Sequence, residues 1–547
     1  MKKIDWLARV LLVFQFLSIA SGGVAQTVPD GDRLKDRTPP GFAIGGVLHA
    51  YDDDSFAPTY VDTAIREFNA TTLTTYMAYG AWPDPAGGPA LQPWTQAVDW
   101  ATVNNLPVHG HALVYPLANQ NLAWYVALPD DQLEPTLEQF VTAMAASRAG
   151  HVWVWDVVNE VMADDGGPMD ADGLRTDLRE YQAIGPEYVD KAFHWAAAAD
   201  PNALRIINDY SIVDGRDKAD RLLAYMIKLR DRGVPIDGVG LQLHFLDTTS
   251  TPDIAAIETN FQRFADAGFR IFITEFDLPA TRRNNASDQP NEGEVQRQRN
   301  AFKQITRVAL EQPACEALFF WDFADERSWL HPSMIDIEFI SQGQFTFPTM
   351  FSGGRENPIV AKAAYYGVQE ALTEFVGTYR INSLLEPGSG LLSRAARSDG
   401  QGGVSATDQV ELIDDDDNSL AYSSAKWSLE PVASGLVRVR CMWNSETGYL
   451  SRAGSFDGQQ WQPGPAVYLA NFQPDWLSQM WFVALQPDGS VTLQNAWGSN
   501  NGYLTRDTQL APQKWKNRRS FDTTPMKSVS MGEQGEAATR WLLMPTR

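Results

Sequence analysis

The chain has 547 residues, a formal net charge of −24 and only two cysteines. This length exceeds what one hydrophobic core usually organises, so we expect at least two domains. The negative charge argues against nucleic acids and anionic membrane surfaces as partners. Cys315 and Cys441 fall in different predicted domains, which argues against a disulfide framework and favours two free or buried thiols. No Cys/His cluster has the spacing of a zinc site, and we expect no metal.

Residues 1–25 have the pattern of a secretory signal peptide. Residues 1–3 include two lysines, residues 6–20 are mostly apolar, and residues 23–25 are small, as at a cleavage site. The alternative is an uncleaved N-terminal anchor, which the small residues at the end of the segment disfavour. No later stretch is long and apolar enough to span a membrane. We therefore expect a secreted protein, extracellular or periplasmic, whose mature chain begins at Gln26.

Strand-like runs alternate with helical ones from about residue 39 to residue 372, within a first domain that we place at residues 26–373. The predicted strands are residues 42–47, 71–77, 108–115, 152–158, 204–208, 239–244, 271–274 and 317–321. The clearest helical patterns between them are residues 188–199, 218–232, 254–267 and 294–312. Eight strands alternating with helices predict an α/β fold, a (β/α)8 TIM barrel. A doubly wound open sheet is the alternative, and the lack of a Gly-rich phosphate loop after the first strand disfavours it.

Two of the predicted strands lead into a glutamate. Residues 152–158 run into Glu160, and residues 270–274 run into Glu275. Both runs are β-branched, aromatic and too apolar to alternate, as in a strand that is covered on both faces. In a parallel barrel, catalytic groups lie at such strand ends. Two carboxylates that face each other across a cleft are the minimum equipment for cleaving a glycosidic bond, although a single such glutamate is also compatible with a structural ion pair.

Several segments that carry these residues resemble glycoside hydrolase family 10 in content and order. They are residues 109–114, 155–160, 207–210, 233–244, 273–277, 321, 328–329 and 361–365. The resemblance covers about residues 41–372, and members of the family are mostly retaining endo-β-1,4-xylanases on a (β/α)8 barrel. It implies cleavage of a β-1,4-linked polysaccharide, xylan or xylan-like, through a covalent glycosyl-enzyme intermediate. It further implies that no cofactor is needed, and we expect a monomer whose partner is the polysaccharide.

The resemblance implies roles for the residues around the two glutamates. Glu275 would be the nucleophile, and Glu160 would protonate the leaving oxygen and then deprotonate the incoming water. Glu160 must start protonated, so its pKa should be raised. Asn159 would bind the sugar 2-hydroxyl, a contact that strengthens in the transition state. His244 would orient Glu275, and Asp277 would fix His244 in turn.

Four further residues are expected to bind substrate. Gln242 lies two positions before His244 on the same strand face and should also point inward. By resemblance, His111 would contact the glycone, and Trp321 and Trp329 would form a hydrophobic wall at the cleavage point. The alternatives are that His111, Gln242 and His244 are satisfied polar core groups and that Trp329 only packs under a loop. Asp209 is more often structural than catalytic in this position.

The second predicted strand departs from the family. Where the family has a Glu-Asn pair followed by Met-Lys-Trp, this chain has Thr74 and Thr75, with Ala78 in place of the Lys and Tyr79 in place of the Trp. Residues 115–116 are Tyr-Pro where the family has Trp-His. A site that loses hydrogen-bonding groups discriminates substrates differently. The hypothesis is therefore that the glycone side reads a decorated xylan or another glycan, with weak or absent activity on ordinary xylan.

Two other function classes stay open at this point. One is a non-catalytic polysaccharide-binding protein whose barrel has lost activity, which the retention of both Glu160 and Glu275 disfavours. The other is a transglycosylase that uses the same covalent intermediate. The size of the products formed when acceptor sugar is abundant would distinguish it from a hydrolase.

Residues 374–547 change in character and contain an internal repeat. Helical periodicity stops, and a set of residues that begins at Trp427 recurs 54 positions later, beginning at Trp481. Three all-β units, closed by Trp427, Trp481 and Trp541, resemble a β-trefoil. The Gln-x-Trp signature at residues 479–481 resembles ricin-type lectin domains, which implies a carbohydrate-binding module. The closing tryptophans are interpreted as core residues.

Other tryptophans of this region lie in turn-rich stretches and are candidates for stacking on sugar rings. They are Trp443, Trp461, Trp497 and Trp515. The acidic run at residues 414–417 is compatible with a cation site, but a solvated loop is the favoured interpretation.

Overall fold

The computed structural model describes residues 33–39, 41–75, 80–83, 86–246, 251–332 and 344–375, and most of the strands between residues 377 and 545. Within these residues, no helix has the length and apolar character needed to cross a membrane. Many side chains beyond residue 376 lie outside the description, so the C-terminal part is treated at the level of its backbone.

Eight parallel strands close into a barrel in sequence order, with each strand paired to the next and β8 paired to β1. They are β1 (Ala43–His49), β2 (Ala70–Thr74), β3 (Val108–His111), β4 (Val152–Asn159), β5 (Leu204–Asp209), β6 (Gly238–Leu241), β7 (Arg270–Phe276) and β8 (Cys315–Phe320). The predicted (β/α)8 barrel is therefore confirmed. The third and sixth predicted strands end earlier than predicted, at His111 and Leu241, and the residues that follow belong to loops at the carboxyl end of the barrel. β2 ends at Thr74, and residues 76–77 of the second predicted strand lie outside the described residues.

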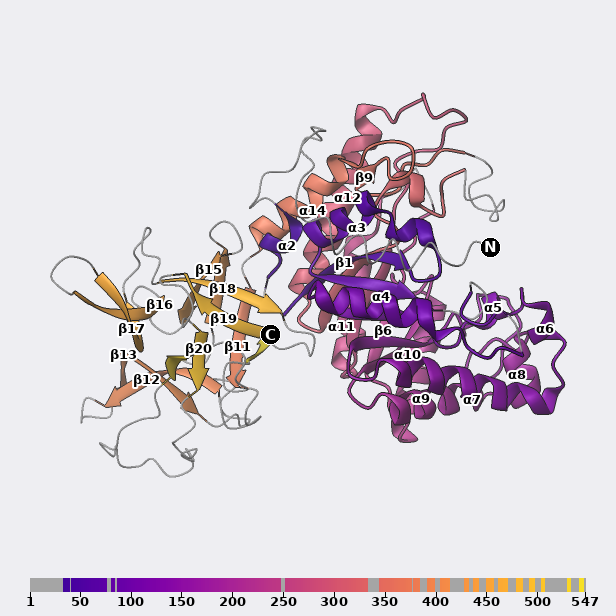
Figure 1. Ribbon diagram of the computed structural model, residues 1–547, viewed down its shortest axis with the longest axis horizontal. Helices are drawn as coiled ribbons and strands as arrows, with labels where there is room; N and C mark the ends of the chain where they lie inside the picture. Colours follow the sequence, from indigo (N-terminus) through magenta and orange to yellow (C-terminus); the bar gives the residue numbers. More distant parts are fainter. Residues whose placement is uncertain are drawn as a thin grey trace.

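Helices cover the outside of the barrel, as Figure 1 shows. The longer ones are α3 (Pro58–Glu67), α4 (Leu91–Val103), α7 (Asp130–Ser147), α9 (Tyr188–Ala199), α10 (Asp217–Asp231), α11 (Ile254–Asp266), α12 (Glu292–Glu311) and α14 (Ala363–Glu374). The short ones are α2 (Leu34–Arg37), α5 (Pro116–Asn119), α6 (Ala123–Val126), α8 (Arg179–Ile184) and the 3-10 turns η1 (Asp53–Phe56) and η3 (Asp325–Arg327). All four clear helical patterns of the sequence are present, and α12 begins with a capping box between Asn291 and Glu294.

The strands are apolar on both faces because they separate two cores. Inside the barrel, small and large side chains from six strands pack together: Ala43, Ala70, Val154, Ile206, Phe272, Ala317 and Phe319. A larger core lies between the strands and the helices. At Gly110, a Cβ would lie 2.4 Å from the Trp155 ring, so β3 and β4 can approach there only with glycine.

The carboxyl ends of four strands turn through left-handed backbone that non-glycine residues rarely adopt. Glu160, Ser211, Leu243 and Asp322 have φ angles of 60°, 56°, 58° and 54°, and they follow β4, β5, β6 and β8. Such conformations persist only where the surroundings enforce them, and they concentrate at functional sites. They mark this end of the barrel as the place to look for one.

Beyond residue 376, every strand described pairs in antiparallel fashion, and the described residues include no α-helix. The strands are β11 (Gly377–Ser383), β12 (Leu391–Ser398), β13 (Val404–Ile413), β14 (Trp427–Pro431), β15 (Leu436–Cys441), β16 (Tyr449–Phe456), β17 (Trp461–Ala470), β18 (Met480–Leu485), β19 (Val491–Asn495), β20 (Tyr503–Arg506), β21 (Val529–Gly532) and β22 (Trp541–Pro545). The region is thus all-β, as predicted, while the β-trefoil itself stays a prediction.

Two of the closing tryptophans are core residues, as interpreted from the sequence. Trp427 and Trp481 are fully buried, and the indole N–H of Trp481 donates to the Leu450 carbonyl at 3.0 Å. The third, Trp541, has a side chain outside the description, as do all four candidate stacking tryptophans and the acidic run at 414–417. Cys315 is a buried free thiol, as expected.

Candidate active site

Glu160 and Glu275 both lie at the carboxyl end of the barrel. Glu275 belongs to β7 and is only 3% exposed. Glu160 directly follows β4, and its backbone N–H donates to the carbonyl of Asn208 on β5 at 2.9 Å. This bond and the positive φ turn the Glu160 side chain out of the strand direction. The structure therefore brings the two predicted catalytic carboxyl groups to one end of the fold, on strands from opposite halves of the barrel.

The Glu275 carboxylate is held by three polar neighbours. Asn208 donates its Nδ2 to Oε1 at 2.5 Å, and His244 Nε2 lies 3.1 Å from Oε2. His111 Nδ1 lies 3.8 Å from Oε1. Hydrogen bonds to a charged group are short and directional. The arrangement therefore fixes the direction of the Glu275 side chain.

His244 connects Glu275 to a buried acid. Its Nδ1 lies 3.0 Å from Asp277 Oδ2, and that oxygen also accepts the indole N–H of Trp329 at 2.6 Å. Burial alone lowers the pKa of His244, but the carboxylates of Asp277 and Glu275 outweigh it and raise the pKa to about 10. An imidazolium between two acids fixes the orientation of Glu275. The predicted sequence of contacts from Asp277 through His244 to Glu275 is present.

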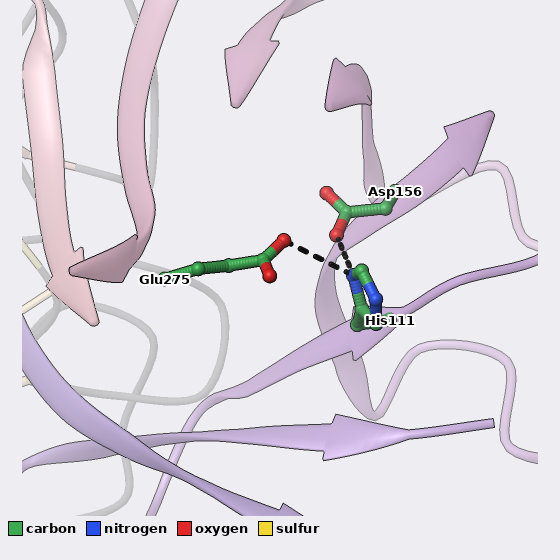
Figure 2. A group of neighbouring side chains, drawn as sticks. All are labelled: His111, Asp156 and Glu275. Carbon is green, nitrogen blue, oxygen red and sulfur yellow. Dashed lines mark hydrogen bonds and ion pairs between the residues drawn. The ribbon is translucent and has the colours of Figure 1, made fainter. Parts of the chain in front are cut away.

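Two further histidines, His109 and His111, share the acid Asp156, and His111 also approaches Glu275. Figure 2 shows His111 between Asp156 and Glu275, with its Nδ1 2.6 Å from Asp156 Oδ2. His109 Nε2 lies 2.9 Å from the other Asp156 oxygen, and both histidines lower the pKa of Asp156 despite its burial. Although burial lowers the pKa of His111, the carboxylates of Glu275 and Asp156 raise it overall. Sequence reasoning gave Asp156 no role, although a buried acid inside an apolar strand was visible.

His111, Asp156 and Glu275 also form a group whose ligand-type atoms lie within 4.8 Å of one another. Each of these atoms already has a partner within the group or beside it: both oxygens of Asp156 pair with histidines, and Glu275 accepts from Asn208 and His244. The two acids of the group are thus partnered by His111 within it and by His109, His244 and Asn208 beside it. The group is an ion-pair network that positions Glu275.

Glu160 lies in a different environment from Glu275. Burial raises the pKa of Glu160, and the negative charges of Asp209 and Glu275 act in the same direction. The Gln242 amide, which donates to Glu160 Oε1 at 3.0 Å, and the Tyr115 hydroxyl act against this rise. The net direction is the raised pKa expected of an acid that starts protonated.

Asn159 is buried beside both glutamates. Its Oδ1 accepts from Asn208 at 2.9 Å and from Gln242 at 3.3 Å. Among the residues that the structure describes, its Nδ2 makes no hydrogen bond although it is buried. A buried donor without a partner is costly, so this amide is available for a ligand.

Asn208, like Asp156, is a residue of the site to which sequence reasoning gave no role. Its Nδ2 donates both to Asn159 and to Glu275, and its Oδ1 accepts from Thr274 at 2.7 Å. The register pairs Asn208 with Asn159 and with Gly240, where an added Cβ would lie 2.3 Å from Asn208 Oδ1. The available signal was a polar residue at the end of an apolar strand, two strands from β7.

Asp209 has the structural role that was expected of it. Its Oδ1 lies 2.8 Å from Lys218 Nζ, and its Oδ2 accepts the backbone N–H of Met162 at 3.0 Å. Lys218 is itself buried and lies over the Tyr210 ring. These contacts hold the segment that follows Glu160.

Two tryptophans flank the histidines. The Trp321 ring meets His111 edge to face at 5.0 Å between centroids and His244 at 6.3 Å. Trp329 lies tilted against His244 at 4.8 Å and is half-buried. The structure places both where the predicted wall of the site would be, and Trp329 does more than pack under a loop, because its N–H binds Asp277.

The altered second strand is described in part. Thr74 and Thr75 are buried at the end of β2, while Ala78 and Tyr79 lie outside the described residues. The Thr74 hydroxyl lies 3.3 Å from His49 Nδ1, and the Thr75 backbone N–H donates to the His111 carbonyl at 2.6 Å. The replacement residues are therefore built into the same end of the barrel.

Comparison with known proteins gives one family. The model of glycosyl hydrolase family 10 matches residues 35–371. The chain is 33% identical to endo-1,4-beta-xylanase B of Thermotoga neapolitana over 296 residues, which cover 53% of this chain and 79% of that relative. It is 32% identical over 297 residues to endo-1,4-beta-xylanase A of Cellvibrio japonicus, covering 50% of this chain and 46% of that relative.

Solved structures agree with this result. Native xylanase 10B from Thermotoga maritima superimposes with a TM-score of 0.52 at 30% identity, covering 62% of this chain and 98% of that structure. Xylanase 10B from Thermotoga petrophila, solved in complex with xylobiose, gives a TM-score of 0.52 at 29% identity, covering 64% of this chain and 98% of that structure.

Proposed function

The chain belongs to glycosyl hydrolase family 10, and from that premise we propose that it is a secreted, retaining enzyme that cleaves the β-1,4-linked backbone of xylan or a xylan-like polysaccharide. The catalytic domain is that of a glycoside hydrolase and is endo-xylanase-like. The relatives named above are xylanases, and one of them binds xylobiose. The observation that carries the proposal is the difference between the environments of Glu160 and Glu275.

In the first step, Glu275 attacks the anomeric carbon of the sugar on the glycone side. The hydrogen bonds from Asn208 and His244 hold this carboxylate in direction, and His111 adds a charge contact at 3.8 Å. Glu160 gives its proton to the oxygen of the leaving sugar, so that the departing group is a neutral alcohol. The products of this step are a covalent glycosyl-enzyme ester at Glu275 and an ionised Glu160.

In the second step, water hydrolyses the ester. Esterification removes the negative charge of Glu275, which contributes to the raised pKa of Glu160. The pKa of Glu160 therefore falls, so that its carboxylate stays ionised until it takes a proton from the water that attacks the anomeric carbon. Two inversions at one carbon give net retention of configuration.

Asn159 supplies a further contact to the substrate, beside the two carboxyl groups. Asn208 and Gln242 hold the Asn159 amide by its oxygen, which leaves Nδ2 directed elsewhere. We assign this donor to the 2-hydroxyl of the attacked sugar, where a hydrogen bond strengthens as charge develops on the ring.

A related β-glycanase acting on a decorated or different glycan is the second candidate. The observation that favours it is the second strand, where Thr74 and Thr75 stand in place of the family's Glu-Asn pair and Thr74 is engaged with His49. The non-catalytic alternative is disfavoured because Glu160 and Glu275 keep their distinct hydrogen-bond partners.

We also propose the division of the chain: a signal peptide at residues 1–25, the catalytic barrel domain at residues 26–373 and a carbohydrate-binding β-trefoil at residues 374–547. The support for the β-trefoil is the internal repeat, the all-β pairing of the described strands and the burial of Trp427 and Trp481.

Proton NMR of the first products tests the retaining mechanism. During hydrolysis of xylo-oligosaccharides, the β-anomer should appear first and the α-anomer only later, by mutarotation. Initial appearance of the α-anomer would show inversion and contradict the role of Glu275 as nucleophile. Glu275→Gln should release no product in the same experiment, and wild-type release by this variant would also contradict the assignment.

A further inference from the structure

A second polar cluster lies at the carboxyl end of the barrel, at the ends of β1, β2 and β8. It consists of His49, Thr74 and Asp322. His49 ends β1 and Thr74 ends β2, and the register pairs the two directly. The same register pairs Thr74 with His111 on β3, so these three residues lie in one layer across three strands.

The cluster is held rigidly and has one accessible member. His49 Nδ1 lies 3.3 Å from the Thr74 hydroxyl, and His49 Nε2 lies 3.5 Å from Asp322 Oδ1. Asp322 takes a left-handed backbone with φ 54° and also accepts the Tyr60 hydroxyl at 3.4 Å. Its side chain is only 3% exposed, whereas that of His49 is 25% exposed. Thr74 thus engages Nδ1 of an imidazole that keeps an exposed part, while Nε2 has only a charge contact with Asp322 and makes no hydrogen bond to a described residue, so Nε2 is the ring atom left for a ligand.

The cluster shares a wall with the catalytic site. The His49 ring meets Trp321 edge to face at 5.8 Å, and Trp321 meets His111, which contacts Glu275. Two strand steps separate His49 from His111, which is about 10 Å because neighbouring strands lie about 4.8 Å apart. A sugar at His49 is therefore not the attacked ring but one further along the chain.

The position of Glu160 shows whether the sugar at His49 is on the glycone side or on the leaving-group side of the cleaved bond. The leaving sugar must lie beside the acid at the end of β4, where Gln242 of the β6 end and Tyr115 also contact Glu160. β8, which carries Asp322 after its end, lies directly across the barrel from β4, and β1, which ends at His49, is three strands away, since the strands close in sequence order. The sugars that pass His49 therefore belong to the glycone side.

We propose that His49, oriented by Thr74 and Asp322, is a specificity-determining residue that hydrogen-bonds a hydroxyl group of the second glycone sugar. In this role His49 replaces the Glu-Asn pair of the family, at whose positions this chain has Thr74 and Thr75. The inference rests on the proposed function for the nature of the bond cleaved, and it adds which residue reads the glycone. The buried Asp322 carboxylate lies 3.5 Å from the imidazole and would repel a negatively charged ligand. We therefore expect the ligand to be an uncharged sugar hydroxyl.

The test compares substrates that differ by one glycone sugar. The contribution of the second sugar is the ratio of two kcat/KM values, the first for para-nitrophenyl β-xylobioside and the second for para-nitrophenyl β-xyloside. His49→Ala should lower this ratio by about tenfold, mainly through KM, as the loss of one hydrogen bond implies. His49→Gln, which keeps a donor, should recover part of the ratio, and Asp322→Asn should lower it less than His49→Ala does.

His194→Ala is the matched control, because His194 is exposed on α9. It should leave the ratio unchanged. An unchanged ratio in His49→Ala, or an equal loss on both substrates, overturns the proposal. The same ratio is measured with the β-cellobioside and β-glucoside pair. If the wild-type enzyme cleaves only the β-cellobioside and β-glucoside, the proposed xylan substrate is contradicted, and the role of His49 is still tested by the ratio for this pair. If it cleaves neither the xylose-based nor the glucose-based pair, both proposals are overturned.

Discussion

Glu160 and Glu275 have the same side chain, but their neighbours give them opposite tasks. Glu275 is surrounded by donors and by two histidines whose pKa values are raised by neighbouring acids. Glu160 has mainly burial and like charges, which favour its protonated form. The raised pKa of Glu160 is the property expected of the acid in a glycosidase, and the fixed direction of Glu275 is that expected of the nucleophile.

Asn208 offers the sharpest test of how Glu275 is held. Asn208→Ala removes the shortest hydrogen bond to the nucleophile and one of the bonds that fix Asn159. Because a hydrogen bond to a charged group contributes about 1.5–3 kcal/mol, kcat should fall by about 10- to 100-fold. Steady-state kinetics on xylo-oligosaccharides measures this, with Asn202→Ala, an exposed asparagine before β5, as the control. A kcat within twofold of wild type would contradict the role.

The pH dependence of activity tests the assignment of Glu160 as the acid. Gln242 donates to the ionised form of Glu160 and so lowers its pKa. Gln242→Met removes this donor, so the pKa of Glu160 should rise and the basic limb of kcat/KM should move to higher pH. The exposed Gln262→Met should leave the profile in place. A basic limb that stays fixed or moves to lower pH would show that another group controls it.

At the scale of the elements, the barrel and the place of Glu160 and Glu275 at one end of it were predictable, because strand periodicity and strand-end carboxylates are local signals. Asn208 was not, because its importance comes from the register that brings β4, β5 and β7 together. The network of His109 and Asp156 was missed for the same reason, since its partners lie on neighbouring strands. The lengths of two strands were also overestimated. The predictions ran to residues 115 and 244, whereas β3 ends at His111 and β6 at Leu241, and the residues that follow lie in loops that carry side chains of the site.

Gly240 on β6 tests whether the register shapes the site. A Cβ at this position would lie 2.3 Å from Asn208 Oδ1 and 3.0 Å from Thr274 Cγ2. Gly240→Ala should therefore displace Asn208, lower kcat by at least about tenfold and destabilise the fold by about 1–3 kcal/mol. Chemical denaturation and kinetics measure the two effects. Gly293→Ala, where the nearest contact is 3.3 Å, is the control, and equal behaviour of the two variants would contradict the argument.

At the scale of the whole molecule, the chain combines a catalytic barrel with a repeated all-β region. The family match ends at residue 371 and α14 ends at Glu374, close to the boundary expected from composition. The sequence repeat is the argument that residues 374–547 bind glycan, because the candidate stacking side chains lie outside the described part of the chain. A region of this kind would act by keeping the barrel near an insoluble substrate.

Removal of residues 374–547 tests this division of labour. The remaining chain should hydrolyse soluble xylo-oligosaccharides at the wild-type rate and lose retention on insoluble xylan in a pull-down assay. The double variant Trp443→Ala/Trp497→Ala in the full-length chain should show the same loss without a truncation. Unchanged retention in both proteins would show that this region is not a binding module.

The most direct test of the account is the product profile of the purified protein on plain xylan, with Glu275→Ala as the blank. Glucuronoarabinoxylan and mixed-linkage glucan complete the panel. The account predicts xylo-oligosaccharides from plain xylan with the wild-type protein and none with the variant. Products from another glycan with silence on xylan would assign the altered glycone side to a different substrate. Equal product from wild type and Glu275→Ala, or silence on every glycan, would contradict the central claim.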